Sequence, residues 1–160
     1  MDAWQLDSAQ IVIRLAAATF IGGVLGLDRE VHSKPAGMRT HALVSLGAAL
    51  MTVTTLELLG GPNVDRAAIT RTIQGIIAGV GFLGGGAILR AKDREEVTGL
   101  TTAASIWIVA ALGIACGGGL WVSASVSVLL SLLVLIIGRR VEGYVHRHFG
   151  RRESNPQLPP

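Results

Sequence analysis

The sequence has 160 residues, of which 50% are hydrophobic and only 16% are charged, and it contains 21 glycines. Soluble domains usually carry about 25% charged residues, so the composition excludes an ordinary soluble domain, and it also excludes a disordered or collagen-like chain. The mean hydropathy is +0.53 and the pI is about 9.8. The basic residues alternate with apolar stretches too long for a solvated helix, which argues against nucleic-acid binding and favours a membrane protein.

Nearly uncharged windows divide the sequence into five candidate membrane helices. Crossing the roughly 30 Å of hydrocarbon in a bilayer takes about 20 mostly apolar residues. The first three windows cover residues 8–27, 40–59 and 70–89. The stretch 97–138 carries no charge and is about twice as long as one span, so it is expected to form two helices that break at residues 117–119, which are all glycine. We therefore predict an all-α bundle of five transmembrane helices.

The distribution of Lys and Arg predicts the orientation of this bundle. Most of the 14 basic residues follow the first span, the third span or residue 138. Because cytoplasmic loops are enriched in Lys and Arg, we expect the N-terminus outside and the C-terminus in the cytoplasm. Residues 1–10 lack the basic region of a secretory signal, so the first span is expected to stay in the mature protein. Residues 1–140 are expected to form the transmembrane domain, and residues 141–160 a short basic cytoplasmic tail that is partly disordered.

Glycines recur four residues apart within the predicted spans. This spacing places both members of a pair on one helix face, where two backbones can approach closely. The pairs are Gly22 and Gly26, Gly75 and Gly79, Gly81 and Gly85, and Gly113 and Gly117. Residues 79–84 also match G-x-G-x-x-G, but a dinucleotide-binding fold needs that motif between a strand and a helix. We interpret the glycines as packing positions; the alternative is that the stretch 79–89 breaks its helix and lines a cavity. Formation of a homo-oligomer stays open.

Four polar side chains lie near the outer ends of the predicted spans and are called the outer polar layer: Arg14, Glu57, Arg71 and Gln74. A charge near the bilayer centre costs at least about 2.5 kcal/mol. Either arginine is therefore expected to pair with Glu57, or both are expected to snorkel to the interface.

A denser group of charges is predicted at the inner ends of the spans. Residues 28–30, Asp-Arg-Glu, end the first span, and residues 34–41 lead into the second. A loop that only sets topology needs basic residues but no interleaved acidic ones. Pro35 and Gly37 favour a defined turn. The alternative is a solvated charged loop.

Four motifs in order resemble the MgtC/SapB family: GLDRE at 26–30, KPAGMRTH at 34–41, GVGFLGGGAIL at 79–89 and VTGLTTAASIW at 97–107. The resemblance covers about residues 15–140. It implies a multi-pass protein of the bacterial inner membrane that is associated with growth under magnesium limitation and, in pathogens, with virulence inside macrophages. It does not imply magnesium transport; suggested activities are modulation of the membrane potential or of the proton-driven ATP synthase. Longer members carry an ACT-like cytosolic domain after the last span, which residues 139–160 are too few to form.

The resemblance also implies two sets of functional residues. The first, the functional charge cluster, would dock a partner or gate a polar route, and it comprises Asp28, Arg29, Glu30, Lys34, Pro35, Gly37, Arg39, Thr40 and His41. The second, the helix-packing wall, would stand beside the first, and it comprises Gly79, Gly81, Gly84, Gly85, Gly86, Thr101, Thr102 and Ser105.

Three functions are weighed. The leading hypothesis is a regulator in the lipid bilayer that acts on another inner-membrane complex, with no nucleic acid as partner. The alternative is a small ion transporter or channel, with a route lined by Arg14, Glu57, Asp28 and Glu30, but no predicted span has an acidic residue near its middle, where ion sites usually lie. An enzyme is least expected, since no nucleophile and base occur at a recognisable spacing. Neither a metal site nor a cofactor is predicted, because His32 and His41 lack a Cys or Glu ligand pattern.

Overall fold

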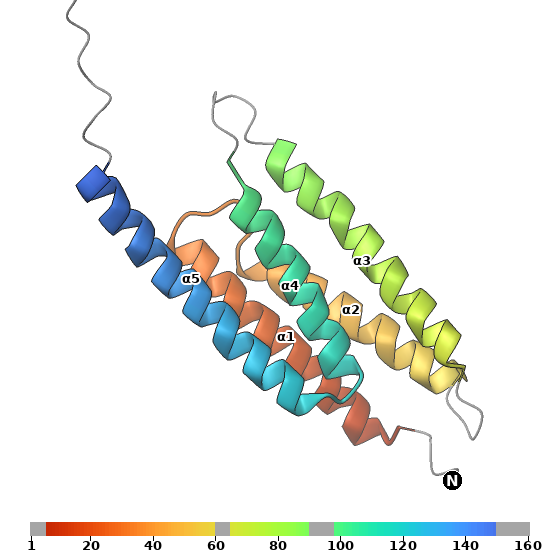
Figure 1. Ribbon diagram of the computed structural model, residues 1–160. Helices are drawn as coiled ribbons and strands as arrows, with labels where there is room; N and C mark the ends of the chain where they lie inside the picture. The colour runs from red at the N-terminus through yellow and green to blue at the C-terminus, as the bar shows by residue number, and fades with distance from the viewer. Residues whose placement is uncertain (1–5, 60–64, 90–97, 150–160) are drawn as a thin grey trace, which may run out of the picture.

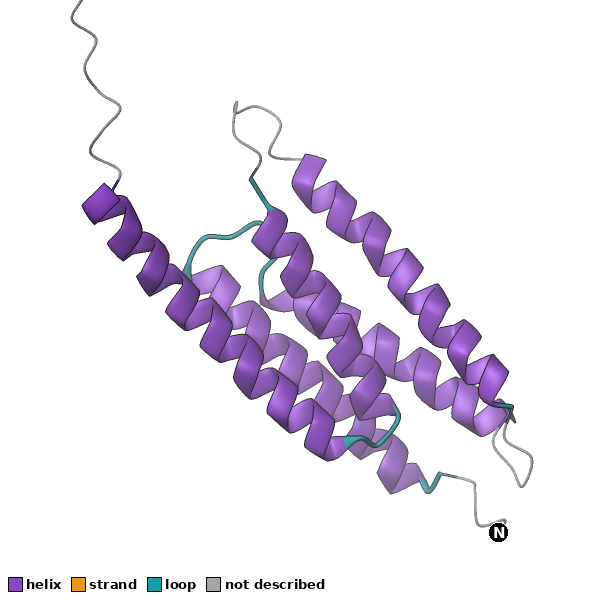
Figure 2. Ribbon diagram, viewed as in Figure 1, coloured by secondary structure: helices purple, strands orange, loops and turns teal. Residues whose placement is uncertain are grey.

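The computed structural model describes residues 6–59, 65–89 and 98–149, and these form five α-helices without a strand (Figures 1 and 2). The helices are α1 (Ser8–Val31), α2 (Met38–Leu59), α3 (Arg66–Leu89), α4 (Leu100–Gly117) and α5 (Trp121–Phe149). All five are long and apolar enough to cross a membrane. The prediction of five membrane helices is therefore confirmed. Helix α5 continues past its apolar part, so residues 141–149 of the expected tail extend that helix.

The break predicted within the long uncharged stretch is a tight turn between α4 and α5. Gly119 adopts a φ of +71°, a conformation that glycine reaches without the steric cost of a Cβ. The Leu120 N–H donates to the Ala115 carbonyl at 2.8 Å, and the Gly119 N–H donates to the Cys116 carbonyl at 3.0 Å. These are the two bonds of a Schellman motif, which ends a helix by satisfying its last carbonyls.

Helix α4 lies at the centre of the bundle (Figure 1). It packs against each of the other four helices, whereas α3 contacts only α2 and α4, and α5 contacts only α1 and α4. Half of the apolar stretch of α4 is buried, compared with 6% of that of α5. Large apolar side chains cover the outside of the bundle, as at Phe82, which is 84% exposed, and Val122, which is 79% exposed. Such an exterior fits hydrocarbon rather than water as its surroundings.

Two of the glycine pairs bring α1, α2 and α4 close together. A Cβ on Gly22 would lie 2.6 Å from the His41 carbonyl oxygen, and one on Gly26 would lie 2.6 Å from the Cα of Met38. On α4, a Cβ on Gly117 would lie 2.7 Å from the Ala49 carbonyl oxygen, and one on Gly113 would collide with the Ser45 carbonyl. The packing role predicted for these two pairs is confirmed, and α2 is the helix that both pairs contact.

The glycines of α3 behave differently, and most of the predicted helix-packing wall is wrong. A Cβ on Gly75, Gly79, Gly81, Gly85 or Gly86 would meet no atom within 4 Å among the described residues, whereas one on Gly84 would meet the Ala103 Cβ at 3.5 Å. The alternative, a broken helix, is also wrong, because α3 is continuous from Arg66 to Leu89. The spacing permits close approach, but among the described residues no helix packs directly on Gly75, Gly79, Gly81, Gly85 or Gly86.

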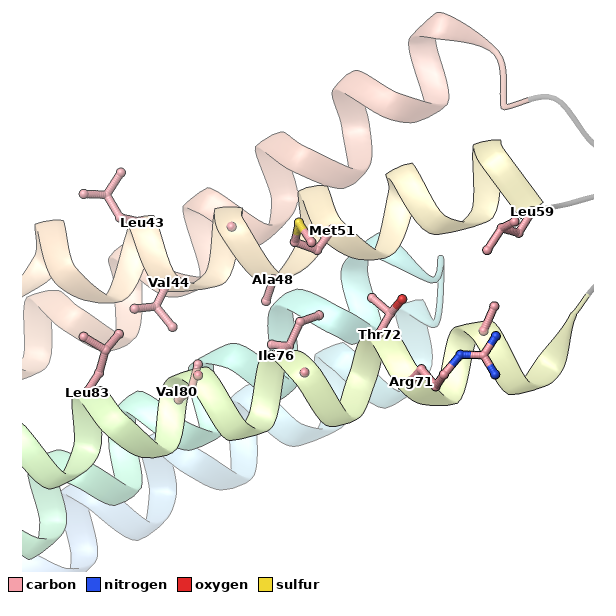
Figure 3. Close-up of a pocket in the computed structure, with 14 residues that line it drawn as sticks. Leu43, Val44, Ala48, Met51, Leu59, Arg71, Thr72, Ile76, Val80 and Leu83 are labelled. Carbon is pink, nitrogen blue, oxygen red and sulfur yellow. The ribbon is translucent and has the colours of Figure 1, made fainter.

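An apolar groove of about 800 Å³ runs between α2 and α3 (Figure 3). Its walls include Val44 and Met51 of α2 and Ile76 and Val80 of α3, and Arg71 lies near one end. Gly47, Gly75 and Gly79 line the groove as well. The groove exists because these glycines contribute no side chain that could fill the space between the two helices.

Candidate functional site

The functional charge cluster lies where α1 ends and α2 begins, and we call this the Asp28 end of the bundle. Asp28 accepts two hydrogen bonds from Arg139 of α5, Nη1 to Oδ2 at 2.7 Å and Nη2 to Oδ1 at 2.8 Å. A bidentate arginine–carboxylate pair fixes both position and orientation. The sequence analysis missed Arg139 as a partner and interpreted it as a basic anchor. The available signal was that Arg139 is the first charged residue after the long uncharged stretch, at the same end of the bundle as Asp28.

Arg29 is almost completely buried, with 3% of its surface exposed. Its Nη2 donates to the Thr102 hydroxyl of α4 at 2.8 Å, and its Nε has no hydrogen-bond acceptor within the described ranges. No carboxylate in those ranges forms an ion pair with it, since the neighbouring Asp28 is bound to Arg139. Successive residues of an α-helix point about 100° apart, so Asp28 and Arg29 contact different helices.

Glu30 stabilises the turn into α2. Its Oε2 accepts the backbone N–H of Met38 at 2.9 Å, and a carboxylate in this position favours the positive end of the helix dipole. A Cβ on Gly37 would lie 2.9 Å from the same oxygen. The Ser33 N–H donates to the Glu30 carbonyl and the Lys34 N–H to the Arg29 carbonyl. The prediction of a defined turn is confirmed, and the glycine leaves room for the capping carboxylate.

His41 joins the cluster to α4. It is 0% exposed, its Nδ1 lies 3.0 Å from the Gly37 carbonyl oxygen, and its Nε2 lies 3.0 Å from the Ser105 hydroxyl oxygen. Because a carbonyl only accepts, the geometry assigns the ring proton to Nδ1. Ser105 also lies 2.8 Å from the Thr102 carbonyl. Thr102 and Ser105 are thus the members of the wall that join the cluster, and a polar chain connects α2, α4 and α1.

The remaining members of the cluster are exposed: Lys34, Pro35, Arg39 and Thr40. No side-chain hydrogen bond to them occurs among the described residues. The exposed Thr101 of the wall lines a cavity of about 650 Å³ together with Lys34, Pro35 and Arg29. The sequence-predicted cluster therefore divides into a part whose side chains bond the helices together and an exposed rim without such bonds among the described residues.

The outer polar layer lies at the other end of the bundle, and its predicted pairing with Glu57 is wrong. The Arg14 Nη1 donates to the Gly117 carbonyl at 2.7 Å, where a cation is favoured by the negative end of the α4 dipole. Arg71 pairs with Asp65 at 3.2 Å, a residue that the sequence analysis did not single out. Glu57 and Gln74 are exposed. Within the described ranges Arg14 therefore pairs with no carboxylate; it caps the end of α4.

A bundle with an apolar exterior and its charges at the helix ends defines a multi-pass membrane protein. The model of the MgtC family matches residues 15–144. The chain belongs to this family, which confirms the resemblance found in the sequence motifs.

Three curated relatives show the extent of the similarity. SrpB of Synechococcus elongatus is 41% identical over 145 residues, which cover 86% of this chain and 80% of SrpB. SapB of Bacillus subtilis is 37% identical over 134 residues, 82% of this chain and 57% of SapB. YhiD of Escherichia coli, whose name proposes magnesium transport, is 36% identical over 131 residues, 80% of this chain and 60% of YhiD. The chain thus spans most of SrpB but well under two thirds of SapB and YhiD. No solved structure matches it.

Proposed function

We propose that this protein is a regulator in the bacterial inner membrane that binds another membrane protein complex through the Asp28 end and supports growth when magnesium is scarce. The observation that carries the proposal is the division of the charge cluster. Its hydrogen-bonded members, which are Asp28, Arg29, Glu30 and His41, connect α1, α2, α4 and α5. Lys34, Arg39 and Thr40 are exposed beside them and form no side-chain hydrogen bond among the described residues. A rigid base with an exposed basic rim is suited to docking, because little ordering of the surface is needed on binding.

The positions of the acidic residues support a regulator over a transporter. Asp28 and Glu30 lie near the end of α1, Glu57 near the end of α2, Asp65 just before α3, and Glu142 in the last turns of α5. Cation and proton routes usually place carboxylates near the bilayer midplane. Within the described helices, none occupies such a position.

We expect the Asp28 end of the proposed regulator to face the cytoplasm. The support is the enrichment of Lys and Arg at that end. Reporter fusions after Gly118 should be active only outside the cytoplasm, and fusions after Phe149 only inside. Cytoplasmic activity of the Gly118 fusion would contradict the orientation.

Docking is tested at Arg39 of the exposed rim, because its side chain forms no hydrogen bond or ion pair among the described residues. Arg39→Ala should abolish the growth support that the protein gives at low magnesium without changing its amount in the membrane. Arg66→Ala at the opposite end, also an exposed arginine, is the matched control. A photo-crosslinking residue at position 39 should capture a membrane partner, the ATP synthase being the first to test, and one at position 66 should not. Normal growth with Arg39→Ala and equal crosslinking at both positions would reject the proposal.

The name of YhiD makes ion transport the second candidate. Purified protein reconstituted in vesicles should give no flux of protons, potassium or magnesium above that of empty vesicles. Flux that is lost with Asp28→Asn and retained with Glu57→Gln would favour transport over regulation.

A further inference from the structure

The feature that the regulator proposal does not explain is a buried guanidinium that has no counter-ion among the described residues. Arg29 is 3% exposed and donates one hydrogen bond to Thr102, and within the same part of the chain its Nε has no acceptor. A buried charge is costly unless an opposite charge or several hydrogen bonds compensate for it. Arg29 lines the cavity of about 650 Å³ at the Asp28 end. The cavity is therefore where a counter-ion of the Arg29 guanidinium could lie.

The start of α4 supplies further donors to the same cavity. Thr98, Gly99, Thr101 and Thr102 line it, and α4 begins without a side-chain cap. The first N–H groups of a helix have no acceptor within the helix. Among the described residues, Ala103 is the first residue of α4 whose N–H donates to a backbone carbonyl, that of Gly99. Unpaired N–H groups and the positive end of the helix dipole together favour a bound anion.

The other charges around the cavity are those of Lys34, Arg139 and Glu142. Arg139 is paired with Asp28, and Lys34 and Glu142 are exposed and carry one charge of each sign. Among the described residues, the buried charge that no ion pair compensates is therefore that of Arg29, and an anion bound beside it would balance it.

The cavity continues into an apolar groove between α4 and α5. Thr101, Val134 and Leu135 line both. The groove has a volume of about 360 Å³, and its walls include Ala104, Ile108 and Leu130. It lies along the apolar stretches of α4 and α5 that are long enough to cross a membrane. A cationic mouth that continues into an apolar groove matches a molecule with an anionic head and a hydrocarbon tail.

We propose that the cavity binds an anionic phospholipid, with its phosphate between Arg29, Lys34 and the first turn of α4 and an acyl chain along the groove between α4 and α5. Arginine and unpaired helix N–H groups are strong phosphate ligands. A phosphate in this position gives the buried guanidinium of Arg29 the opposite charge that the described residues do not supply. The lipid also fills the space beside α5, which contacts only α1 and α4. The site does not depend on the proposed docking of a partner.

The test uses the purified full chain in a neutral detergent, with bound lipid measured by native mass spectrometry. Phosphatidylglycerol should bind more tightly than phosphatidylcholine. Lys34→Gln, a change on the exposed rim, should weaken phosphatidylglycerol binding about fivefold. Arg29→Gln should weaken it at least about tenfold, and Arg29→Lys, which keeps the charge and guards against misfolding, should weaken it less. Arg140→Gln is the matched control, because this exposed arginine is next to Arg139 and does not line the cavity.

A second arm separates a lipid from a free phosphate. Ala104→Trp fills the groove and leaves the cationic mouth intact, so it should reduce phosphatidylglycerol binding. Inorganic phosphate should compete only weakly. Equal binding of the two lipids, or Lys34→Gln and Arg29→Gln both behaving like Arg140→Gln, would overturn the site. Strong competition by inorganic phosphate, with no effect of Ala104→Trp, would overturn the lipid as its occupant.

Discussion

The glycines of α1 and α4 and the glycines of α3 have the same spacing in the sequence and opposite surroundings in the structure. Gly22, Gly26, Gly113 and Gly117 each press against the backbone or a Cβ of α2. Gly75, Gly79, Gly81 and Gly85 face open space among the described residues. A four-residue spacing thus permits a close helix contact but does not create one. The contact forms only where a second helix lies on the glycine face.

The largest expected effect comes from adding a side chain to the packed group. A Cβ at residue 113 collides with the Ser45 carbonyl, which belongs to a helix backbone and cannot rotate away. We expect Gly113→Leu to prevent folding and Gly113→Ala to cost at least about 1–3 kcal/mol, the usual range for overpacking. Size-exclusion profiles and thermal unfolding in detergent would measure this.

Gly79→Leu is the matched control from the open group. It should leave the profile and the melting temperature nearly unchanged, because a Cβ at residue 79 meets no described atom within 4 Å and the groove that this residue lines has room for the rest of the side chain. Equal damage from Gly79→Leu and Gly113→Leu would refute the distinction between the two groups.

The second prediction concerns the ion pair between α1 and α5. Asp28→Asn removes the negative charge from the bidentate contact with Arg139. The Asp28 side chain is 13% exposed and the Arg139 side chain 28%. We expect destabilisation by about 1.5–3 kcal/mol, the range of hydrogen bonds to charged groups. Arg139→Gln should have a similar effect, and the double variant should be little worse than either single one. Additive effects in thermal unfolding would show that the two residues act independently.

The third prediction concerns the cap on α4. Arg14→Gln removes the bond from Nη1 to the Gly117 carbonyl, and we expect a loss of about 1 kcal/mol. Arg14→Lys should fall between the wild type and Arg14→Gln, because an ammonium still favours the negative end of the helix. A melting temperature for Arg14→Lys below that of Arg14→Gln would contradict the capping role.

The smallest effect is expected at the exposed pair between Arg71 and Asp65, whose side chains are 66% and 52% exposed. Exposed pairs contribute about 0–1 kcal/mol. Arg71→Gln should therefore change the melting temperature less than Arg14→Gln does. A larger change in melting temperature for Arg71→Gln than for Arg14→Gln would contradict both the capping role of Arg14 and the weak contribution of the Arg71–Asp65 pair.

Much of the fold could be predicted because the bilayer imposes simple rules. The length of the uncharged windows located all five helices, and the three consecutive glycines located the turn between α4 and α5. The charge cluster was found because interleaved acidic residues are unnecessary in a loop that only sets topology. Each of these inferences uses residues that are close in the sequence.

The partners of the polar residues could not be predicted, because they depend on which helices become neighbours. Arg139 lies 111 positions from Asp28, and Gly117 lies 103 positions from Arg14. The same limit explains the α3 glycines, whose spacing defines a helix face but not what covers it. Local sequence reveals which groups need a partner, and the topology decides which partner they receive.

Helix α5 is joined to the bundle by contacts of two kinds. In its first half, after the turn at Gly119, Ala124, Val128, Leu132 and Leu135 pack on the apolar core. Beyond Leu135, Arg139 forms the ion pair with Asp28 of α1. Loss of that ion pair would leave the first half of α5 packed, so its effect on the shape of the molecule would be confined to the Asp28 end.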